Sequence, residues 1–242
     1  MEMLNDILGY KDLKIYQNDE FFAFSLDSIV LANYCTIRYR DKKIVDFCSG
    51  NAVVSMIISK RTSSNIDGVE IQEKVYDLAV KSIECNKLSD RIRMFNEDIK
   101  DFSNRNLNSY DLVVCNPPYF KIESGNKKNI SPEKLIARHE IMINLNEVCS
   151  CAKKVLKDNG CLTMVHRSDR LMEILTEFRK NNIEPKRIKF VYETVDKAST
   201  LVLIEGQKNG KVGLIIEKPL ILYNEDGSYT SEYACLQKEV RV

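Results

Sequence analysis

The middle of the chain reads Tyr110-Asp111-Leu112-Val113-Val114-Cys115-Asn116-Pro117-Pro118-Tyr119. Its apolar part predicts a buried strand. Two prolines cannot continue a sheet ladder, because proline has no N–H group and a fixed φ. The chain therefore leaves the sheet as a stiff turn at the carboxyl end of this strand, which is where ligands bind in open α/β sheets. An amide side chain, carbonyl groups and an aromatic ring at this turn suit a planar amino group, such as that of adenine or of an amide.

Short apolar runs alternate with longer amphipathic segments from residue 43 onward, a pattern typical of α/β proteins. Strands are predicted over residues 44–47, 66–71, 91–95, 111–115, 161–166, 188–192 and 200–205. Helices are predicted over residues 53–60, 73–87, 145–157 and 169–181. The third helix should stop at Asn159-Gly160. Residues 212–217 either extend the sheet or lie on its edge, and residues 224–227 carry a turn signal.

The composition, 242 residues with 44% hydrophobic and 29% charged, fits one large domain with at most a small appendage. Residues 21–24 and 29–32 suggest a hairpin and a helix. The chain then divides into an N-terminal extension, 1–41, packed on a main domain, 42–242. No apolar run approaches the ~20 residues of a membrane helix, and the first residues lack the regions of a signal peptide. We therefore expect a cytoplasmic protein that does not contact membranes.

Eight cysteines are spread along the chain, mostly in apolar segments, where cysteine acts as a small hydrophobic side chain. There is no C-x-x-C pair, and the two histidines are His139 and His166. We therefore expect reduced thiols and no metal site, and we place neither histidine in the active centre. The sequence indicates no obligate protein partner.

The net charge is +1, so any contact with a polyanion must come from local groups of basic residues. The group that directly follows Tyr119 comprises Lys121, Lys127, Lys128, Lys134 and Arg138. Such a group is by itself typical of a solvated surface. Its position directly after the Asn-Pro-Pro-Tyr turn makes it the basic group that stands out as a candidate for contact with a polyanion.

The first predicted strand runs into Asp46-Phe47-Cys48-Ser49-Gly50-Asn51-Ala52 and then a helix. Glycine lets the backbone approach a ligand, and a helix N-terminus presents free N–H groups. The turn lacks both the G-x-G-x-x-G of dinucleotide folds and the Lys-Ser/Thr of a P-loop. It therefore favours an uncharged ribose and a carboxylate over a phosphate.

Two further acids follow the next two strands. Glu70 lies 24 positions after Asp46, close to the ~20-residue offset at which an acid meets ribose hydroxyls in dinucleotide folds. Asp98 is preferred to Glu97 as an acceptor for an adenine amino group, because the apolar Ile99 beside it suits the edge of a base. The competing interpretations are a solvated Glu70 and a plain helix N-cap at Asp98.

Read with the Asn-Pro-Pro-Tyr turn, these positions resemble the class I S-adenosylmethionine-dependent methyltransferases that act on amino groups. The resemblance implies a Rossmann-like, seven-stranded, mostly parallel, doubly wound sheet with helices on both faces. It also implies that S-adenosylmethionine binds over the glycine turn and the two later acids. The implied cofactor-binding residues are Asp46, Ser49, Gly50, Asn51, Glu70, Ile71 and Asp98.

Longer segments resemble the bacterial tRNA(Val) adenine-37 N6-methyltransferase family. They are residues 24–32, Ala137-Arg138-His139-Glu140, Val165-His166-Arg167, 198–205 and 219–223. This resemblance adds Phe24, Ser25 and Asp27 to the cofactor pocket, whereas their own pattern suggests only a helix start. Ala52 departs from the family, in which glycine is common, and predicts a slightly tighter turn with binding kept.

The catalytic residues implied by the resemblance are Asn116, Pro117 and Tyr119. The adenine amino nitrogen is a poor nucleophile, because its lone pair is delocalised into the ring. The Asn116 side-chain oxygen and the Pro117 carbonyl can accept its two hydrogens, while Tyr119 stacks on an extruded base. Orientation and electrostatics then supply most of the catalysis, and no general base is assigned.

The predicted activity is methylation of N6 of adenine-37 in tRNA(Val), with the anticodon region as the partner. Lys121, Lys127, Lys128 and Arg138 are the candidate RNA contacts.

Three alternative functions remain open. N6-adenine methylation of DNA or rRNA is the first, although DNA enzymes usually carry a separate recognition domain. N5 methylation of a protein glutamine would use the same turn, but such relatives carry a helical domain before the fold. The third is a non-catalytic RNA-binding protein.

Overall fold

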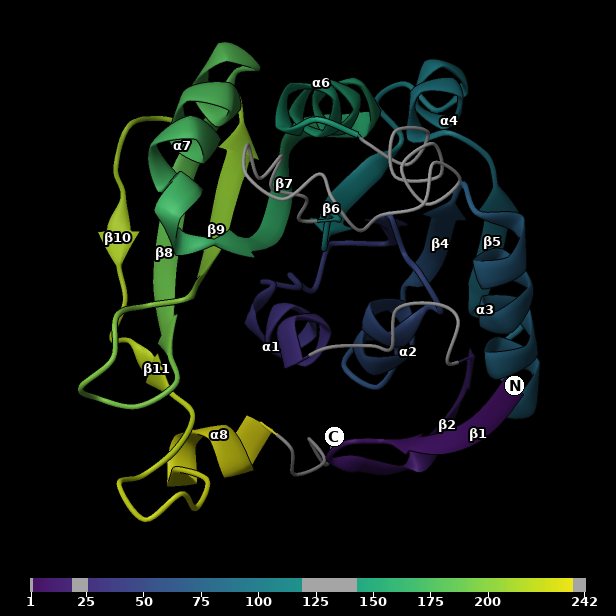
Figure 1. The fold of residues 1–242 in the computed structure, drawn as a ribbon. Coiled ribbons are helices and arrows are strands. Elements are labelled where there is room, and N and C mark those ends of the chain that lie inside the picture. The colour runs from purple at the N-terminus through teal and green to yellow at the C-terminus, as the bar shows by residue number, and fades with distance from the viewer. Residues whose placement is uncertain (1, 19–25, 119–142, 237–242) are drawn as a thin grey trace, which may run out of the picture.

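The computed structural model describes residues 2–18, 26–118 and 143–236 of the 242-residue chain. Its centre is one sheet with the strand order β5-β4-β3-β6-β7-β9-β8 (Figure 1). These strands span Lys43–Phe47 (β3), Asn65–Glu70 (β4), Ile92–Asn96 (β5), Tyr110–Cys115 (β6), Leu156–Arg167 (β7), Ile183–Tyr192 (β8) and Leu201–Lys208 (β9). β9 is antiparallel to both of its neighbours, and the other adjacent strands pair in parallel. The order changes direction between β3 and β6, and such a switch point is where open α/β sheets bind ligands.

Two short strands are added to the seven strands that were predicted for the sheet. β10 (Ile215–Ile216) and β11 (Leu220–Ile221) each pair in parallel with β8. Residues 212–217 thus contribute an edge strand, one of the two arrangements that their pattern left open. The predicted α/β class with a mostly parallel sheet is confirmed.

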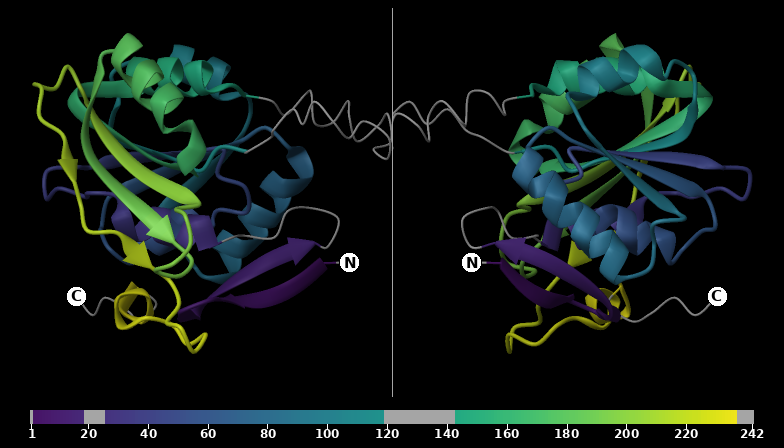
Figure 2. Two further views of the ribbon diagram at one scale, coloured as in Figure 1. Left: turned by 60° about the vertical axis from the view of Figure 1, so that its left-hand side comes forward. Right: turned by 90° about the vertical axis from the view of Figure 1, so that its right-hand side faces the viewer.

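Helices cover both faces of the sheet (Figure 2). One face carries α1 (Leu26–Tyr34), α2 (Val53–Ser59) and α3 (Glu73–Cys85). The other carries α4 (Ile99–Arg105), α6 (Leu145–Val155) and α7 (Leu171–Lys180). Successive strand residues point to opposite faces, so each helical layer has its own buried hydrophobic cluster.

The N-terminal segment packs on the face that carries α1, α2 and α3. β1 (Glu2–Ile7) and β2 (Tyr10–Asn18) form an antiparallel hairpin that is separate from the main sheet. Tyr16 N–H in β2 donates to Ser82 Oγ in α3 at 2.9 Å. Residues 21–24, which suggested a hairpin, lie outside the described residues. The division after residue 41 stays a prediction, and buried side chains from both sides of it share one cluster.

Some element boundaries differ from those predicted. The helix stop at Asn159-Gly160 is wrong, because α6 passes directly into β7 at Leu156. Asn159 has a φ of 61° and lies where the pairing of β7 with β6 shifts in register. This pair of residues therefore marks an irregularity within a strand. The helix predicted from residue 169 begins with a 3-10 turn, η2 (Ser168–Arg170).

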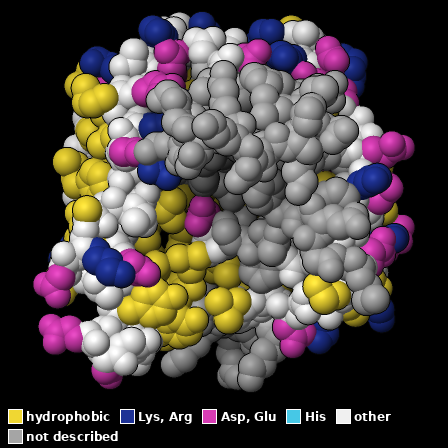
Figure 3. All heavy atoms as spheres, in the orientation of Figure 1, with side chains coloured by type: hydrophobic (Ala, Val, Ile, Leu, Met, Phe, Trp, Pro, Cys, Tyr) yellow, Lys and Arg dark blue, Asp and Glu magenta, His cyan; other side chains and the backbone are white. Residues whose placement is uncertain are grey.

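The C-terminal part of the described chain ends in α8 (Ser231–Leu236). The turn predicted before it is confirmed by a hydrogen bond of 3.0 Å from Gly227 N–H to the Asn224 carbonyl. No helix in the part of the chain that the structure describes is long and apolar enough to cross a membrane. Around the margin of the face shown in Figure 3, basic and acidic side chains lie close to one another.

Candidate functional site

Four strand ends meet at one edge of the sheet. In the register of the sheet Phe47 pairs with both Val69 and Cys115, and Glu70 pairs with Asn96. The segments that follow β3, β4, β5 and β6 therefore leave the sheet side by side. The structure thus brings together the glycine turn and the side chains that were predicted after the other three strands.

The glycine turn has three residues in the left-handed region, with φ of 55° at Cys48, 55° at Gly50 and 67° at Ala52. Ser49 N–H donates to the Val69 carbonyl at 3.1 Å, which ties the turn to β4. A Cβ atom on Gly50 would meet no described residue within 4 Å, so its backbone is uncovered by the part of the chain that the structure describes. This uncovered backbone fits the close approach of a ligand. Asn51, another predicted cofactor contact, is half-buried in the same turn.

Ala52 occupies the N-cap position of α2. A left-handed conformation costs a residue with a Cβ atom roughly 1–2 kcal/mol, which explains why glycine is the less strained choice here. Ala52 N–H nevertheless donates to the Ser49 carbonyl at 2.9 Å, so the turn closes with alanine in place. That cofactor binding is kept with alanine stays a prediction.

Glu70 is enclosed at the end of β4, with 5% of its surface exposed. Its carboxylate accepts hydrogen bonds from Gly50 N–H at 3.0 Å and from the backbone and side-chain N–H groups of Gln72 at 3.0 and 3.3 Å. Burial raises the pKa of Glu70, and these donors act against the rise. The interpretation of Glu70 as a solvated side chain is therefore wrong. A carboxylate fixed beside the glycine turn can still accept hydrogen bonds from ribose hydroxyls.

Asp46 is 1% exposed and lies directly before the turn. Ser55 Oγ donates to Asp46 Oδ2 at 2.8 Å, whereas Oδ1 has no hydrogen-bond partner among the described residues. Burial raises the pKa of Asp46 to about 7, and the negative charge of Glu70 adds to the rise. Ser49 Oγ is also buried and unpaired within the described ranges. Unsatisfied buried polar atoms cost free energy, and a cationic ligand with N–H groups would satisfy this pair.

Asp98 forms the N-cap of α4. Its side chain accepts a hydrogen bond from Lys100 N–H at 2.8 Å, and Lys100 Nζ lies 3.3 Å from the other carboxylate oxygen. The N-cap interpretation is therefore confirmed. A capping carboxylate retains lone pairs for another donor, so its contact with an adenine amino group stays a prediction. Ile71, the predicted neighbour of the cofactor after β4, is 47% exposed.

Asn116 is the first residue beyond β6, which ends at Cys115 as the two prolines predict. Pro117 is buried. The Asn116 side-chain amide donates from Nδ2 to Ser28 Oγ at 3.1 Å. Ser28 lies in the first turn of α1, next to Asp27, a predicted cofactor contact that is half-buried. α1 therefore reaches the Asn-Pro-Pro turn.

Several predicted site residues lie outside the described residues, and their roles rest on the sequence alone. They are Phe24, Ser25, Tyr119, Lys121, Lys127, Lys128 and Arg138.

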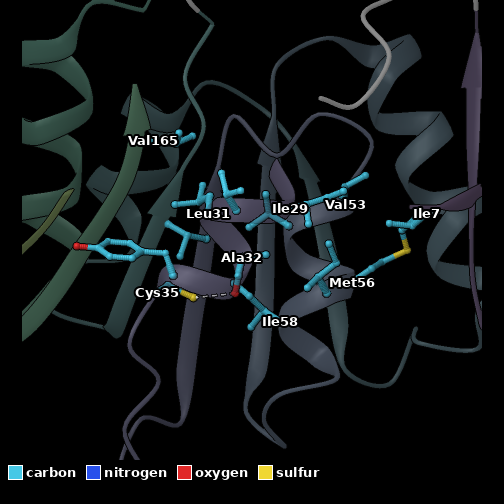
Figure 4. Close-up of a cluster of buried hydrophobic side chains, with 14 of the residues drawn as sticks. Ile7, Ile29, Leu31, Ala32, Cys35, Val53, Met56, Ile58 and Val165 are labelled. Atoms are coloured by element: carbon cyan, nitrogen blue, oxygen red, sulfur yellow. Dashed lines mark hydrogen bonds between the residues drawn. The ribbon is translucent and has the colours of Figure 1, made fainter. Parts of the chain in front are cut away.

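Ser28 and Ser55 were missed as site residues by sequence reasoning. Each is a buried serine that is followed by apolar residues of its helix, a signal that could have indicated a polar partner nearby. Figure 4 shows how their helices meet, with Ile29 of α1 and Met56 of α2 in one buried cluster. The serines therefore sit on helices whose positions are fixed by apolar packing.

His166 lies at the end of β7 and is 3% exposed. Its Nδ1 accepts a hydrogen bond from Arg167 N–H at 2.8 Å. Burial lowers the pKa of His166 to about 4, so the ring is neutral near pH 7.

All eight cysteines are free thiols, and five of them are buried: Cys35, Cys115, Cys149, Cys151 and Cys161. Among the residues with described placement, no group of three His, Cys, Asp or Glu side chains is arranged to hold a metal ion.

Two relatives match this chain over nearly its whole length. A tRNA1(Val) (adenine(37)-N6)-methyltransferase from Flavobacterium psychrophilum is 25% identical over 236 residues, which cover 96% of this chain and 97% of that protein. A protein of the same name from Haemophilus influenzae is 25% identical over 232 residues, with 95% and 96% covered. Both carry the name of the family that the sequence segments resemble.

Solved structures show the same fold. A predicted O-methyltransferase from Agrobacterium tumefaciens superposes with a TM-score of 0.69 at 17% identity, covering 88% of this chain and 95% of that chain. TYW2 from M. jannaschii in complex with AdoMet has a TM-score of 0.58 at 14% identity, with 85% of each chain covered. The family model described as "Methyltransferase small domain" matches residues 25–192, well over half of the sequence. This chain therefore belongs to the methyltransferase small domain family.

Proposed function

We propose that this protein transfers a methyl group from S-adenosylmethionine to N6 of adenine-37 in tRNA(Val). The observation that carries the proposal is the position of Asn116, on a stiff turn at the same sheet edge as Asp46, the glycine turn and Glu70. The names of the two relatives point to the same substrate. We place the enzyme in the cytoplasm, with the anticodon region of the tRNA as its partner.

The cofactor site is formed by side chains whose chemistry matches the parts of S-adenosylmethionine. The unpaired oxygen of Asp46 and the Ser49 hydroxyl suit the amino group of the methionine part, and Glu70 suits the ribose hydroxyls. Asp98 and Ile71 would contact the adenine. Gly50 and Asn51 would contact the cofactor from the glycine turn. Phe24, Ser25 and Asp27 complete the set from the N-terminal side. When bound, the cofactor supplies an electrophilic methyl group on a positively charged sulfur.

The chain's own residues have to orient the target nitrogen. The Asn116 Oδ1 atom and the Pro117 carbonyl accept the two amino hydrogens, which favours localisation of the lone pair on nitrogen. Tyr119 stacks on the extruded base, an interaction that contributes on the order of 1–3 kcal/mol. The buried acids hold negative charge near the cofactor, so electrostatics favours a cationic ligand there. Lys121, Lys127, Lys128 and Arg138 follow the turn in sequence and contact the RNA backbone.

The test is a transfer assay with labelled S-adenosylmethionine and four substrates. These are an unmodified tRNA(Val) transcript, the same transcript with guanine at position 37, a duplex DNA and a protein release factor. We expect label in the first transcript alone, recovered as N6-methyladenosine. Label in the release factor, with none in tRNA, would establish glutamine methylation in its place. Equal label in both transcripts would contradict adenine-37 as the target.

A further inference from the structure

We propose that Ser28 is a positioning residue that holds the Asn116 side-chain amide in place. Asn116 Nδ2 donates to Ser28 Oγ at 3.1 Å, across 88 positions of sequence. Ser28 is 8% exposed and lies in the first turn of α1. The contact therefore joins the N-terminal helix to the turn that follows β6, away from bulk water.

The orientation of this amide matters because its two ends have opposite hydrogen-bonding character. Nδ2 carries two donors, and Oδ1 is an acceptor. With Nδ2 directed at Ser28, Oδ1 points to the other side of the amide plane. An amide turned by half a rotation would present N–H donors to the N–H groups of an amino substrate, so it could not accept their hydrogens.

The rigidity of both partners makes this contact an effective constraint. Asn116 is followed by Pro117, which disfavours the helical region for the Asn116 backbone and favours extended conformations. Ser28 is held by a helix whose Ile29, Val30 and Leu31 are fully or almost fully buried. Neither residue can shift far without disturbing packed elements. A misplacement of about 1 Å at such a group can lower turnover on the order of 100-fold.

The kinetic test of this inference rests on the proposed function. A second test, by nuclear magnetic resonance, needs no substrate. Ser28→Ala removes the acceptor and leaves a buried methyl group. Ser28→Thr keeps the hydroxyl. Ser59→Ala is the matched control, because Ser59 is also 8% exposed on the neighbouring helix α2 but donates to the Met56 carbonyl at 2.7 Å, outside the site.

We expect Ser28→Ala to lower kcat for tRNA methylation by roughly tenfold or more, with the Kd for S-adenosylmethionine within about twofold of the original. Ser28→Thr should recover most of the kcat, and Ser59→Ala should match the unmodified enzyme. Thermal unfolding of every variant separates a folding defect from a positioning defect. A kcat for Ser28→Ala within twofold of the original would overturn the inference.

Nuclear magnetic resonance of ¹⁵N-labelled protein tests the contact itself. The Nδ2 hydrogen of Asn116 that is bonded to Ser28 should exchange slowly with solvent in the unmodified protein and much faster in Ser28→Ala, with Ser59→Ala unchanged. Unaltered Asn116 signals in Ser28→Ala would refute the positioning role even if tRNA is methylated. An unmodified enzyme that methylates no tRNA, yet shows the change in Asn116 exchange, would refute the proposed function alone.

Discussion

At the scale of single residues, two of the site's polar side chains, Asp46 and Asn116, are each paired with a serine from a helix. Ser55 Oγ donates a hydrogen bond to Asp46, and Ser28 Oγ accepts one from Asn116 Nδ2. A hydroxyl can donate or accept, so it adapts to a carboxylate in one case and to an amide N–H in the other. The strand ends place the reactive groups, and the helices on one face determine their orientation.

Asn116→Ala is the most direct test of the turn. The change removes the side-chain acceptor while the glycine turn and Glu70 stay in place. We expect kcat to fall by about 100-fold or more, since an electrostatic acceptor at the reacting group typically contributes 10²–10³. The Kd for S-adenosylmethionine, measured by calorimetry, should remain within a few fold. An equal loss of turnover and cofactor affinity would contradict the assigned role.

The raised pKa of Asp46 predicts that cofactor binding depends on pH. Burial raises this pKa from 3.8 to about 7. Between about pH 4 and pH 7, the Asp46 carboxyl is therefore protonated in the folded protein and ionised in the unfolded chain. The contribution of Asp46 to the free energy of unfolding is therefore complete below about pH 4 and is lost as the pH rises to about 7. A cationic ligand favours the ionised form, so its affinity should rise over the same range.

Calorimetric titrations at pH 6, 7 and 8 check this dependence. We expect the affinity for S-adenosylmethionine to rise by up to about tenfold per pH unit below pH 7 and then to level off. Asp46→Asn should bind weakly with little dependence on pH. Glu70→Gln is the control, because the pKa of Glu70 is also raised by burial. A pH profile that persists in Asp46→Asn and disappears in Glu70→Gln would assign the titration to Glu70.

At the scale of elements, α4 begins at a residue with two candidate roles. Asp98 is the N-cap of this helix in the structure, and the resemblance assigns it to the adenine. Asp98→Ser separates the two, because serine caps helices about as well as aspartate but is too short to reach past the helix end. We expect an unchanged melting temperature and an affinity for S-adenosylmethionine lowered roughly tenfold, the usual effect of losing a hydrogen bond to a charged group.

Unfolding and binding measurements on Asp98→Ser and Asp98→Ala complete this test. The alanine variant should lose about 1 kcal/mol of stability in addition to the binding defect. If Asp98→Ser binds the cofactor as well as the unmodified protein does, Asp98 is a helix cap only.

Most regular elements from residue 43 onward were predictable from periodicity, and the exceptions have local causes. The strand at residues 110–115 was clear because five apolar or aromatic side chains end at two prolines. α4 was predicted only through the alternative N-cap interpretation of Asp98, because it spans only Ile99–Arg105, too short for a helical repeat to be evident. Asn159-Gly160 indicated a helix end, but in the fold it forms an irregularity of β7.

The acids at the strand ends were also predictable. The contacts of Ser28 and Ser55 depend on how helices pack over the sheet, which no local sequence pattern records.

At the scale of the whole molecule, the charge distribution limits how the protein can hold RNA. The net charge is +1, with 36 basic and 35 acidic residues. Many described basic side chains are paired with acids, as Lys81 is with Glu2 at 2.8 Å and Arg187 with Glu217 at 2.6 Å. A uniform positive surface is therefore not available for RNA. Affinity has to come from base contacts and from a few local cations.

This limit predicts a shallow salt dependence of tRNA binding. Each phosphate neutralised contributes about 0.7–0.9 to the slope of log affinity against log salt. If Lys121, Lys127, Lys128 and Arg138 make the main phosphate contacts, the slope should be about −3. Replacing all four with alanine should bring it close to zero, while Lys81→Ala, which removes a paired lysine, should leave it unchanged. Filter binding between 50 and 200 mM salt measures the slope. A steep slope that survives the fourfold replacement would mean that the tRNA docks on another surface of the molecule.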